Sequence, residues 1–253
     1  MRFPLPSLKS VAFPSRGTPA VLLEGMFHSL EGEGEWPAAV VCHPHPLGGG
    51  TMHNAVVSAL ARALAARGVM ALRFNFRGVE RSGGEHDNGR GEQADVAGAL
   101  DWLLAQPGVD PWRVFVVGYS FGAWVGVNHA QSDPRVTAVA TVGLVAWHYD
   151  IDFFRSQTRP DLRSTQCLRT VQAASLAVVE LEQYDAAFLQ SFTRPKLFIT
   201  GEHDPLAPPA VLRRLVDRIP EPKRLHVIPG ADHSLRGREQ EVGKVVAEFL
   251  AGL

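Results

Sequence analysis

The sequence predicts an α/β fold, in which a mostly parallel central sheet is covered by helices on both faces. Short runs rich in β-branched and other apolar residues alternate with stretches whose apolar residues recur at helical spacing. The short runs are almost wholly apolar, as strands buried on both faces of a parallel sheet are. Because the chain has 253 residues, 45% of them hydrophobic, we expect one domain over residues 1–253.

Seven segments are expected to form the strands of this sheet. The first is expected to add an antiparallel edge, and the other six are expected to run parallel. In chain order, the expected strands span residues 20–27, 38–42, 69–74, 113–118, 136–143, 196–200 and 224–229.

Three intervening segments carry the apolar stripe of a helix that packs on a sheet. Such stripes indicate core faces rather than cofactor-binding surfaces. The first stripe is Val56, Val57, Leu60 and Leu64, the second is Val96, Leu100, Leu103 and Leu104, and the third is Val242, Val245, Val246, Phe249 and Leu250.

Residues 144–195 break the alternation of strands and helices. The stretch "YDIDFFRSQTRP" (149–160) is echoed 35 residues later by "YDAAFLQSFTRP" (184–195). A single short echo indicates a local duplication rather than a solenoid, which needs several repeats. We expect residues 144–183 to be an insertion at the carboxyl-terminal edge of the sheet, either a small lid or a surface excursion.

Composition argues against several classes of partner. The net charge is −1, and no block of lysine and arginine suggests a nucleic-acid partner. The two cysteines make no disulfide framework, no apolar run is long enough to span a membrane, and prolines interrupt the N-terminal segment where a signal peptide needs an apolar core. We therefore expect a cytoplasmic protein without a membrane span; its oligomeric state is left open.

The strongest motif is Gly118-Tyr119-Ser120-Phe121-Gly122, a G-x-S-x-G pattern between an expected strand and an expected helix. A serine on a sharp strand-to-helix turn is strained, and glycine on either side removes Cβ atoms that would collide there. The turn lifts the hydroxyl above the sheet, close to a helix N-terminus that favours developing negative charge. Ser120 is therefore the expected nucleophile.

A serine nucleophile needs a histidine base and a carboxylate that orients the base. Asp204 follows the expected strand 196–200, and His233 follows the expected strand 224–229. We expect Asp204 and His233 to complete a triad with Ser120. Glu202 is an alternative acid, whereas Asp232 is expected to be solvated because adjacent side chains seldom face each other in a loop.

Residues 42–54, "CHPHPLGGGTMHN", raise the question of a metal site. His43 and His45 could supply two ligands, but a catalytic zinc needs three, and His53 lies beyond the glycine run. We therefore expect no metal and no cofactor. His86 and Asp87, in a polar glycine-rich loop, are expected to be exposed to solvent.

Taken together, these motifs resemble those of the α/β-hydrolase superfamily, from about Ala20 to the C-terminus. More narrowly, the chain resembles the small branch related to dienelactone hydrolases and acyl-peptidase domains, and a group within it that carries "HPHP", then "GG", and an "RFNFRG" strand end. These motifs fall here at residues 43–46, 48–50 and 73–78. The chain departs from the pattern at Glu80, where the resemblance leads us to expect glycine, and in its extra length before Tyr184.

The resemblance implies that the loop after the strand 38–42 supplies half of an oxyanion hole. Phe121, which follows the nucleophile, should donate one backbone N–H. Pro44 and Pro46 have no N–H, so His45 and Leu47 are the nearest donors in the loop, with Leu47 slightly favoured. The histidine rings are expected to brace this loop by hydrogen bonds.

We therefore expect a carboxylesterase-like serine hydrolase, which cleaves an ester or related acyl bond of a small-molecule substrate through an acyl-enzyme. The same triad could serve a peptidase, a thioesterase or an acyltransferase, and sequence does not separate these. A binding module that keeps the fold without turnover is the alternative from another class.

Overall fold

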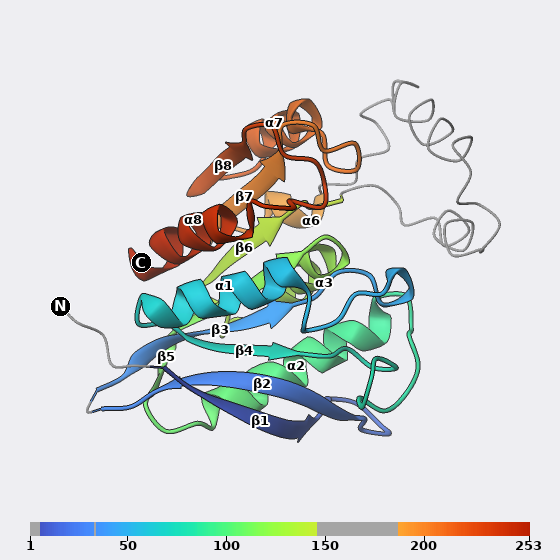
Figure 1. The fold of residues 1–253 in the computed structure, drawn as a ribbon, viewed down its shortest axis with the longest axis vertical. Helices are drawn as coiled ribbons and strands as arrows, with labels where there is room; N and C mark the ends of the chain where they lie inside the picture. The colour runs from blue at the N-terminus through green and yellow to red at the C-terminus, as the bar shows by residue number, and fades with distance from the viewer. Residues whose placement is uncertain (1–5, 33, 146–186) are drawn as a thin grey trace.

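A computed structural model describes residues 6–32, 34–145 and 187–253. Their strands form one sheet in the order β1-β2-β4-β3-β5-β6-β7-β8, with β1 and β8 at the two edges (Figure 1). β2 runs antiparallel to both of its neighbours, and every other neighbouring pair is parallel. The strands are β1 Pro6–Pro14, β2 Leu22–Leu30, β3 Trp36–Cys42, β4 Met70–Phe74, β5 Val109–Tyr119, β6 Ala138–Val142, β7 Lys196–Gly201 and β8 Lys223–Ile228.

The predicted α/β class and the six parallel strands are confirmed, but the predicted edge is wrong. The segment expected at residues 20–27 forms β2, and β1 pairs with its outer side from Pro6↔Leu30 to Pro14↔Leu22. Phe13 is the one buried hydrophobic residue of β1, so the strand carries little of the apolar signal that identified the others. Proline at both ends is typical of an edge strand.

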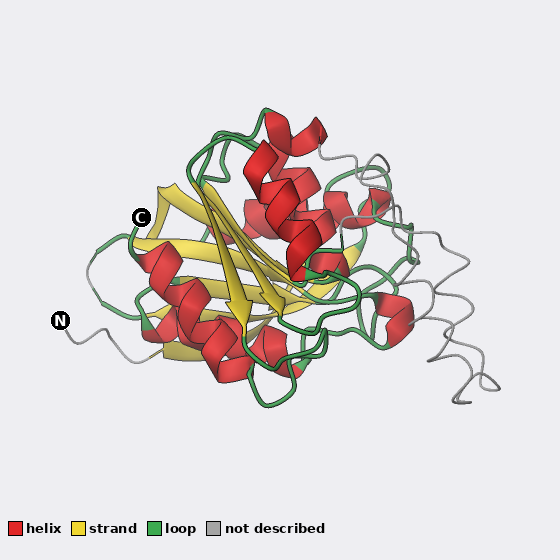
Figure 2. Ribbon diagram, turned by 90° about the horizontal axis from the view of Figure 1, so that it is seen from above, coloured by secondary structure: helices red, strands yellow, loops and turns green. Residues whose placement is uncertain are grey.

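The helices cover both faces of the sheet (Figure 2). The three predicted stripes lie in helices that pack against it. Residues of α1 and α8 pack in the core on one face, and residues of α2, α3, α6 and α7 pack in the core on the other. The helices are α1 Ala55–Ala66, α2 Arg90–Leu104, α3 Phe121–Ser132, α6 Ala187–Gln190, α7 Pro209–Arg218 and α8 Glu239–Ala251. The insertion expected at residues 144–183 lies, from residue 146 on, outside the described residues.

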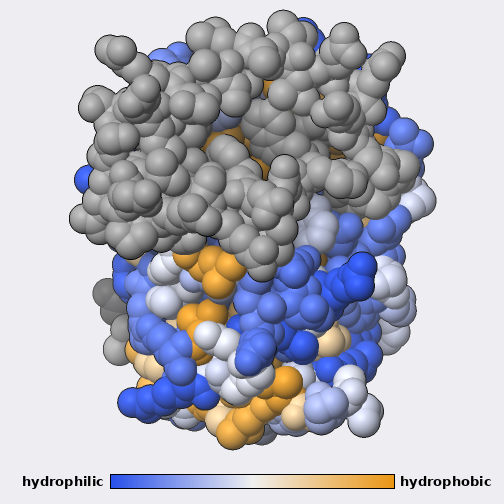
Figure 3. Space-filling model, turned by 90° about the vertical axis from the view of Figure 1, so that its right-hand side faces the viewer, coloured by the Kyte–Doolittle hydropathy of each residue, from blue (hydrophilic) through white to orange (hydrophobic). Residues whose placement is uncertain are grey.

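The described surface is mixed in polarity on the face drawn in Figure 3, where separate hydrophobic patches interrupt a mainly hydrophilic surface. Among the described residues, no helix has the length and apolarity needed to cross a membrane.

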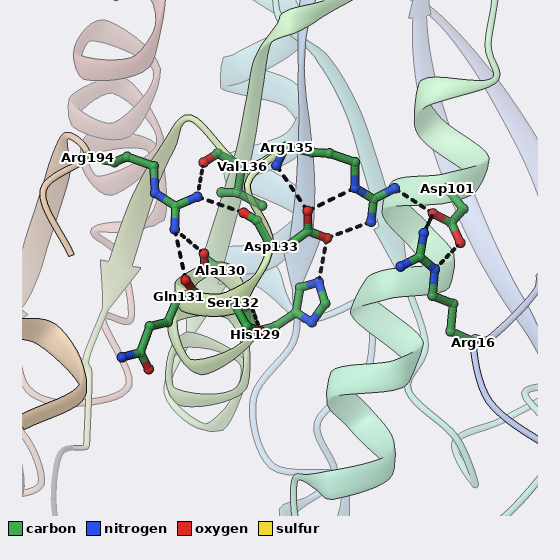
Figure 4. Close-up of polar contacts among 10 residues, drawn as sticks. All are labelled: Arg16, Asp101, His129, Ala130, Gln131, Ser132, Asp133, Arg135, Val136 and Arg194. Carbon is green, nitrogen blue, oxygen red and sulfur yellow. Dashed lines mark hydrogen bonds and ion pairs between the residues drawn. The ribbon is translucent and has the colours of Figure 1, made fainter. Parts of the chain in front are cut away.

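A guanidinium fastens the start of β7 to the end of α3 (Figure 4). Arg194 donates hydrogen bonds to the carbonyl oxygens of Ala130, Gln131, Asp133 and Val136. The last carbonyls of a helix have no partner within the helix, and a cation near them also complements the helix dipole. Arg194 therefore sets where β7, and the loop that follows it, lie relative to the helix that follows Ser120.

Candidate active site

Ser120 lies on the sharp turn that the sequence predicts, between β5 and α3. Its backbone has φ 55° and ψ −117°, which an L residue rarely adopts. The turn is held by the Ser120 N–H, which donates to the carbonyl oxygen of Val142 at 2.8 Å. The hydroxyl is thereby placed at the carboxyl ends of the parallel strands, next to the first turn of α3.

The glycines of the motif are there for the steric reason expected. A Cβ atom on Gly118 would lie 2.3 Å from the carbonyl oxygen of Gly122. One on Gly122 would lie 2.5 Å from the carbonyl oxygens of Cys42 and His43. The start of α3 consequently packs directly against the end of β3, which brings the histidine-rich loop next to Ser120.

The structure brings the three predicted residues into one chain of contacts. Ser120 Oγ lies 3.0 Å from His233 Nε2, and His233 Nδ1 lies 2.8 Å from Asp204 Oδ2. Asp204 follows β7 and is 3% exposed, and its other oxygen, Oδ1, accepts the N–H groups of Leu206 and Ala207, each at 2.8 Å. With those donors on Oδ1, the carboxylate presents Oδ2 to the imidazole and favours the ring with its proton on Nδ1.

The neighbouring acids have other partners. Glu202 Oε2 accepts the Gly230 N–H at 2.8 Å, and the Glu202 side chain is 53% exposed. Asp232 Oδ1 accepts from the backbone and the hydroxyl of Ser234. Of these three carboxylates, Asp204 is the one in contact with His233.

Two further residues shape the position of His233, and neither was predicted from the sequence. The Tyr119 hydroxyl donates to the backbone carbonyl of His233 at 2.8 Å. Gly143 follows β6 with φ 56°, and a Cβ atom on it would lie 3.0 Å from His233 Cε1 and 3.6 Å from Asp204 Oδ2. A glycine directly after a buried strand was the available signal for this close approach.

Replacing Gly143 with alanine is expected to displace the imidazole. The new methyl group enters the space against the ring of His233, and the left-handed backbone adds strain. We expect kcat to fall about a hundredfold, because small errors in the placement of a reacting group are costly. The assay is ester hydrolysis with circular dichroism to verify folding; Gly237→Ala, which has φ 75° and nothing near its Cβ, carries the same backbone strain as a control. Equal rates in the two variants would contradict the prediction.

The histidine-rich loop, residues 43–52, is folded on itself after β3. Its centre is a short 3₁₀ turn, Pro46–Gly48, and the N–H groups of Gly48 and Gly50 both donate to the His45 carbonyl at 3.0 Å. The Leu47 N–H donates to His45 Nδ1 at 3.2 Å, so the slightly favoured oxyanion donor is engaged within the loop.

His43 braces the loop, as the sequence predicts of the histidine rings. It is fully buried; its Nε2 accepts the Phe76 N–H at 3.0 Å, and its Nδ1 lies 2.6 Å from the Pro44 carbonyl oxygen. These partners require a neutral ring with the proton on Nδ1. Burial lowers the pKa of His43 to about 4, which agrees with the neutral form.

Acid is expected to destabilise the protein through this ring. The folded-state pKa of about 4 lies below the ordinary value of 6.5, so the unfolded chain binds the proton first as the pH falls. The stabilisation that the neutral His43 ring gives the folded state is complete above pH 6.5 and is lost as the pH falls towards 4. At pH 5, the free energy of unfolding is lowered by about 2 kcal/mol for His43 alone. Burial also lowers the pKa of His45 and of His28 to about 4, so both residues add to the loss of stability in acid. Urea unfolding at pH 7, 6 and 5 measures the loss, and a free energy independent of pH would contradict it.

The expectation that His86 is exposed to solvent is wrong. Its side chain is 10% exposed, and its Nδ1 lies 2.7 Å from Oε1 of the fully buried Glu92. Its ring centroid lies 5.0 Å from that of His45 and 5.5 Å from that of Phe121. Asp87, by contrast, is exposed as expected. His86 therefore forms part of the packing beneath the histidine-rich loop.

The histidines of the loop are arranged as braces rather than as metal ligands. Both ring nitrogens of His43 and the Nδ1 of His45 face partners within the protein. No group of three or more potential ligands with the geometry of a metal site occurs in the described parts of the chain. The absence of a metal and of a cofactor stays a prediction.

The sheet topology, with a serine on a strained strand-to-helix turn, defines the chain as an α/β serine hydrolase. Within that class it belongs to the prolyl oligopeptidase family, whose family model matches residues 55–251. The predicted superfamily is thus confirmed, and the narrower group marked by the histidine-rich loop stays a prediction.

Three known proteins illustrate the relationship. An uncharacterized protein of Rickettsia prowazekii, RP471, is 30% identical over 219 residues, which make up 85% of this chain and 78% of that protein. The structure of an α/β serine hydrolase homologue from Coxiella burnetii is 29% identical with a TM-score of 0.71, covering 94% of this chain and 96% of that one. XC6422 from Xanthomonas campestris, described as an α/β serine hydrolase without lid, is 25% identical with a TM-score of 0.69, covering 96% and 94%.

Proposed function

We propose that the protein hydrolyses an ester or related acyl bond of a small-molecule substrate, with Ser120, His233 and Asp204 as its catalytic triad. The observation that carries the proposal is the unbroken chain from Ser120 Oγ to His233 Nε2 at 3.0 Å and from His233 Nδ1 to Asp204 Oδ2 at 2.8 Å. The alignment of hydroxyl, imidazole and buried carboxylate is what proton removal from serine requires.

In the acylation half-reaction, Ser120 Oγ attacks the acyl carbon while His233 Nε2 takes the hydroxyl proton. The carbonyl π electrons move onto the oxygen, and the imidazolium is stabilised by Asp204. His233 then gives the proton to the leaving group as its bond to the acyl carbon breaks. In the second half-reaction water attacks the acyl-enzyme, His233 takes a proton from that water, and Ser120 leaves with the proton restored.

The negative charge on the acyl oxygen needs donors beside Ser120. Phe121 begins α3, so its N–H lies at the positive end of the helix dipole. In the loop, the Leu47 N–H donates to His45 Nδ1, and the backbone N–H groups of Leu47 and His45 both stay candidates for the second donor. A single such donor commonly contributes a factor of about 100 to 1,000 to kcat.

The test is reaction with a fluorophosphonate, followed by intact mass and peptide mapping. A single adduct on Ser120 is expected, because phosphonylation uses the same nucleophile, base and oxyanion donors as acyl transfer. A folded protein that stays unmodified would refute the proposal in favour of a binding module.

A peptidase is the second candidate, and the family match is the observation that favours it. The proton transfers would be the same with an amine as leaving group. Parallel assays with p-nitrophenyl esters and with peptide p-nitroanilides separate the two, since an esterase of this kind is expected to hydrolyse the esters alone. The proposed insertion at 144–183 is the segment from which we expect the choice of acyl group to come.

A further inference from the structure

Glu80 stands where the resemblance leads us to expect glycine, and its backbone explains that expectation. Its φ is 50°, in the left-handed region that favours glycine. A glutamate there keeps a strained conformation that glycine would relieve.

The carboxylate of Glu80 fixes the orientation of a buried amide. Asn75 is fully buried, and its Nδ2 donates to Glu80 Oε2 at 2.7 Å and to Glu24 Oε1 at 2.9 Å. The two hydrogens of the amide nitrogen are thus both used. The amide oxygen is left facing the other way, where it accepts the Met52 N–H at 2.7 Å.

Met52 is the last residue of the histidine-rich loop, and its backbone is held on both sides. Asn75 accepts its N–H, and Arg73 Nη1 donates to its carbonyl oxygen at 2.6 Å. Arg73 lies near the end of β4 and Asn75 directly follows the strand, and the side chains of both reach the backbone of Met52. At the other end of the loop, the Phe76 N–H donates to His43. The end of β4 therefore fastens both ends of the histidine-rich loop.

We propose that Glu80 is a positioning residue for the oxyanion donor of the histidine-rich loop, acting through Asn75 and Met52. The inference rests on the proposed function. Without the carboxylate of Glu80, the amide of Asn75 keeps only Glu24 of the two acceptors that orient it, and its hold on the Met52 N–H is weakened. A donor displaced in this way weakens stabilisation of the oxyanion more than binding of the ground state.

The variant Glu80→Gly separates positioning from folding, because it releases backbone strain while it removes the carboxylate. We expect its Tm to stay close to that of the wild type, because the released strain offsets the hydrogen bond that Asn75 loses, and its kcat with p-nitrophenyl butyrate to be about tenfold lower at unchanged KM. Glu80→Gln keeps an oxygen that can accept from Asn75 and is expected to restore most of kcat. Asn88→Gly is the matched control, since Asn88 has φ 52° on the surface and its replacement relieves strain elsewhere. It is expected to leave kcat unchanged.

Amide hydrogen exchange of Met52 supplies a measurement that does not depend on turnover. The exchange of this N–H should be faster in Glu80→Gly than in the wild type, and unchanged in Asn88→Gly. A Glu80→Gly variant with the wild-type kcat and wild-type exchange would overturn the inference. A wild type that neither reacts with a fluorophosphonate nor hydrolyses the ester would refute the proposed function instead, and the exchange of Met52 would still decide whether Glu80 positions the loop.

Discussion

Ser120→Ala is expected to lower kcat about a millionfold, to the level that binding and the oxyanion donors support without a nucleophile. The reason is local: His233 Nε2 lies 3.0 Å from the Ser120 hydroxyl, and alanine leaves it no proton to take. The substituted residue must keep the left-handed turn, which alanine tolerates about as well as serine does. Hydrolysis of p-nitrophenyl butyrate and the midpoint of urea unfolding measure the two effects separately.

Ser132→Ala is the matched control for this substitution. Ser132 ends the same helix that Ser120 precedes, and its exposed hydroxyl bonds to the His129 carbonyl, far along the helix from the site. It is expected to keep full activity. Residual activity of Ser120→Ala close to that of Ser132→Ala would mean that another residue is the nucleophile.

The fold was predictable because most of its strands can be recognised as short apolar segments in the sequence. The segments that became β4, β6 and β7 are buried throughout and are mostly apolar, as is most of β3 and the second half of β5. The edge strand β8 keeps apolar residues at Leu225, Val227 and Ile228, and all six strands lie within a few residues of their predicted places. β1 could not be found in this way, because an exposed edge strand needs few apolar side chains. The insertion at 144–183 was inferred from a break in the pattern, and it stays a prediction.

The residues of the candidate site were predictable where a sequence motif identifies them. They were not predictable where their position depends on tertiary packing. The nucleophile and its glycines follow from a local turn, and Asp204 and His233 follow from their places after strands. His86 lies in a polar loop whose composition indicates exposure, and its burial depends on Glu92, six residues later in α2. The hydrogen bonds from Asn75 to Glu80 and to Met52 join two loops that are separated in the sequence and are brought together only by folding.

Asp204→Asn is expected to lower kcat about ten-thousandfold, whereas Glu202→Gln should leave it unchanged. The Leu206 and Ala207 N–H groups need an oxygen at the Oδ1 position, so the asparagine will keep its oxygen there and turn its NH₂ group towards His233. An NH₂ group donates, which forces Nδ1 of the imidazole to accept and puts the ring proton on Nε2. A protonated Nε2 cannot take the proton of Ser120.

Glu202→Gln is a sharp control because it makes the same chemical change two residues away. The glutamine still accepts the Gly230 N–H, and the exposed side chain has no contact with His233. Both variants are expected to unfold at nearly the wild-type urea concentration, and the rate of fluorophosphonate labelling should fall with kcat in Asp204→Asn only. A larger loss in Glu202→Gln would transfer the role of the acid to Glu202 and would require the loop after β7 to rearrange when substrate binds.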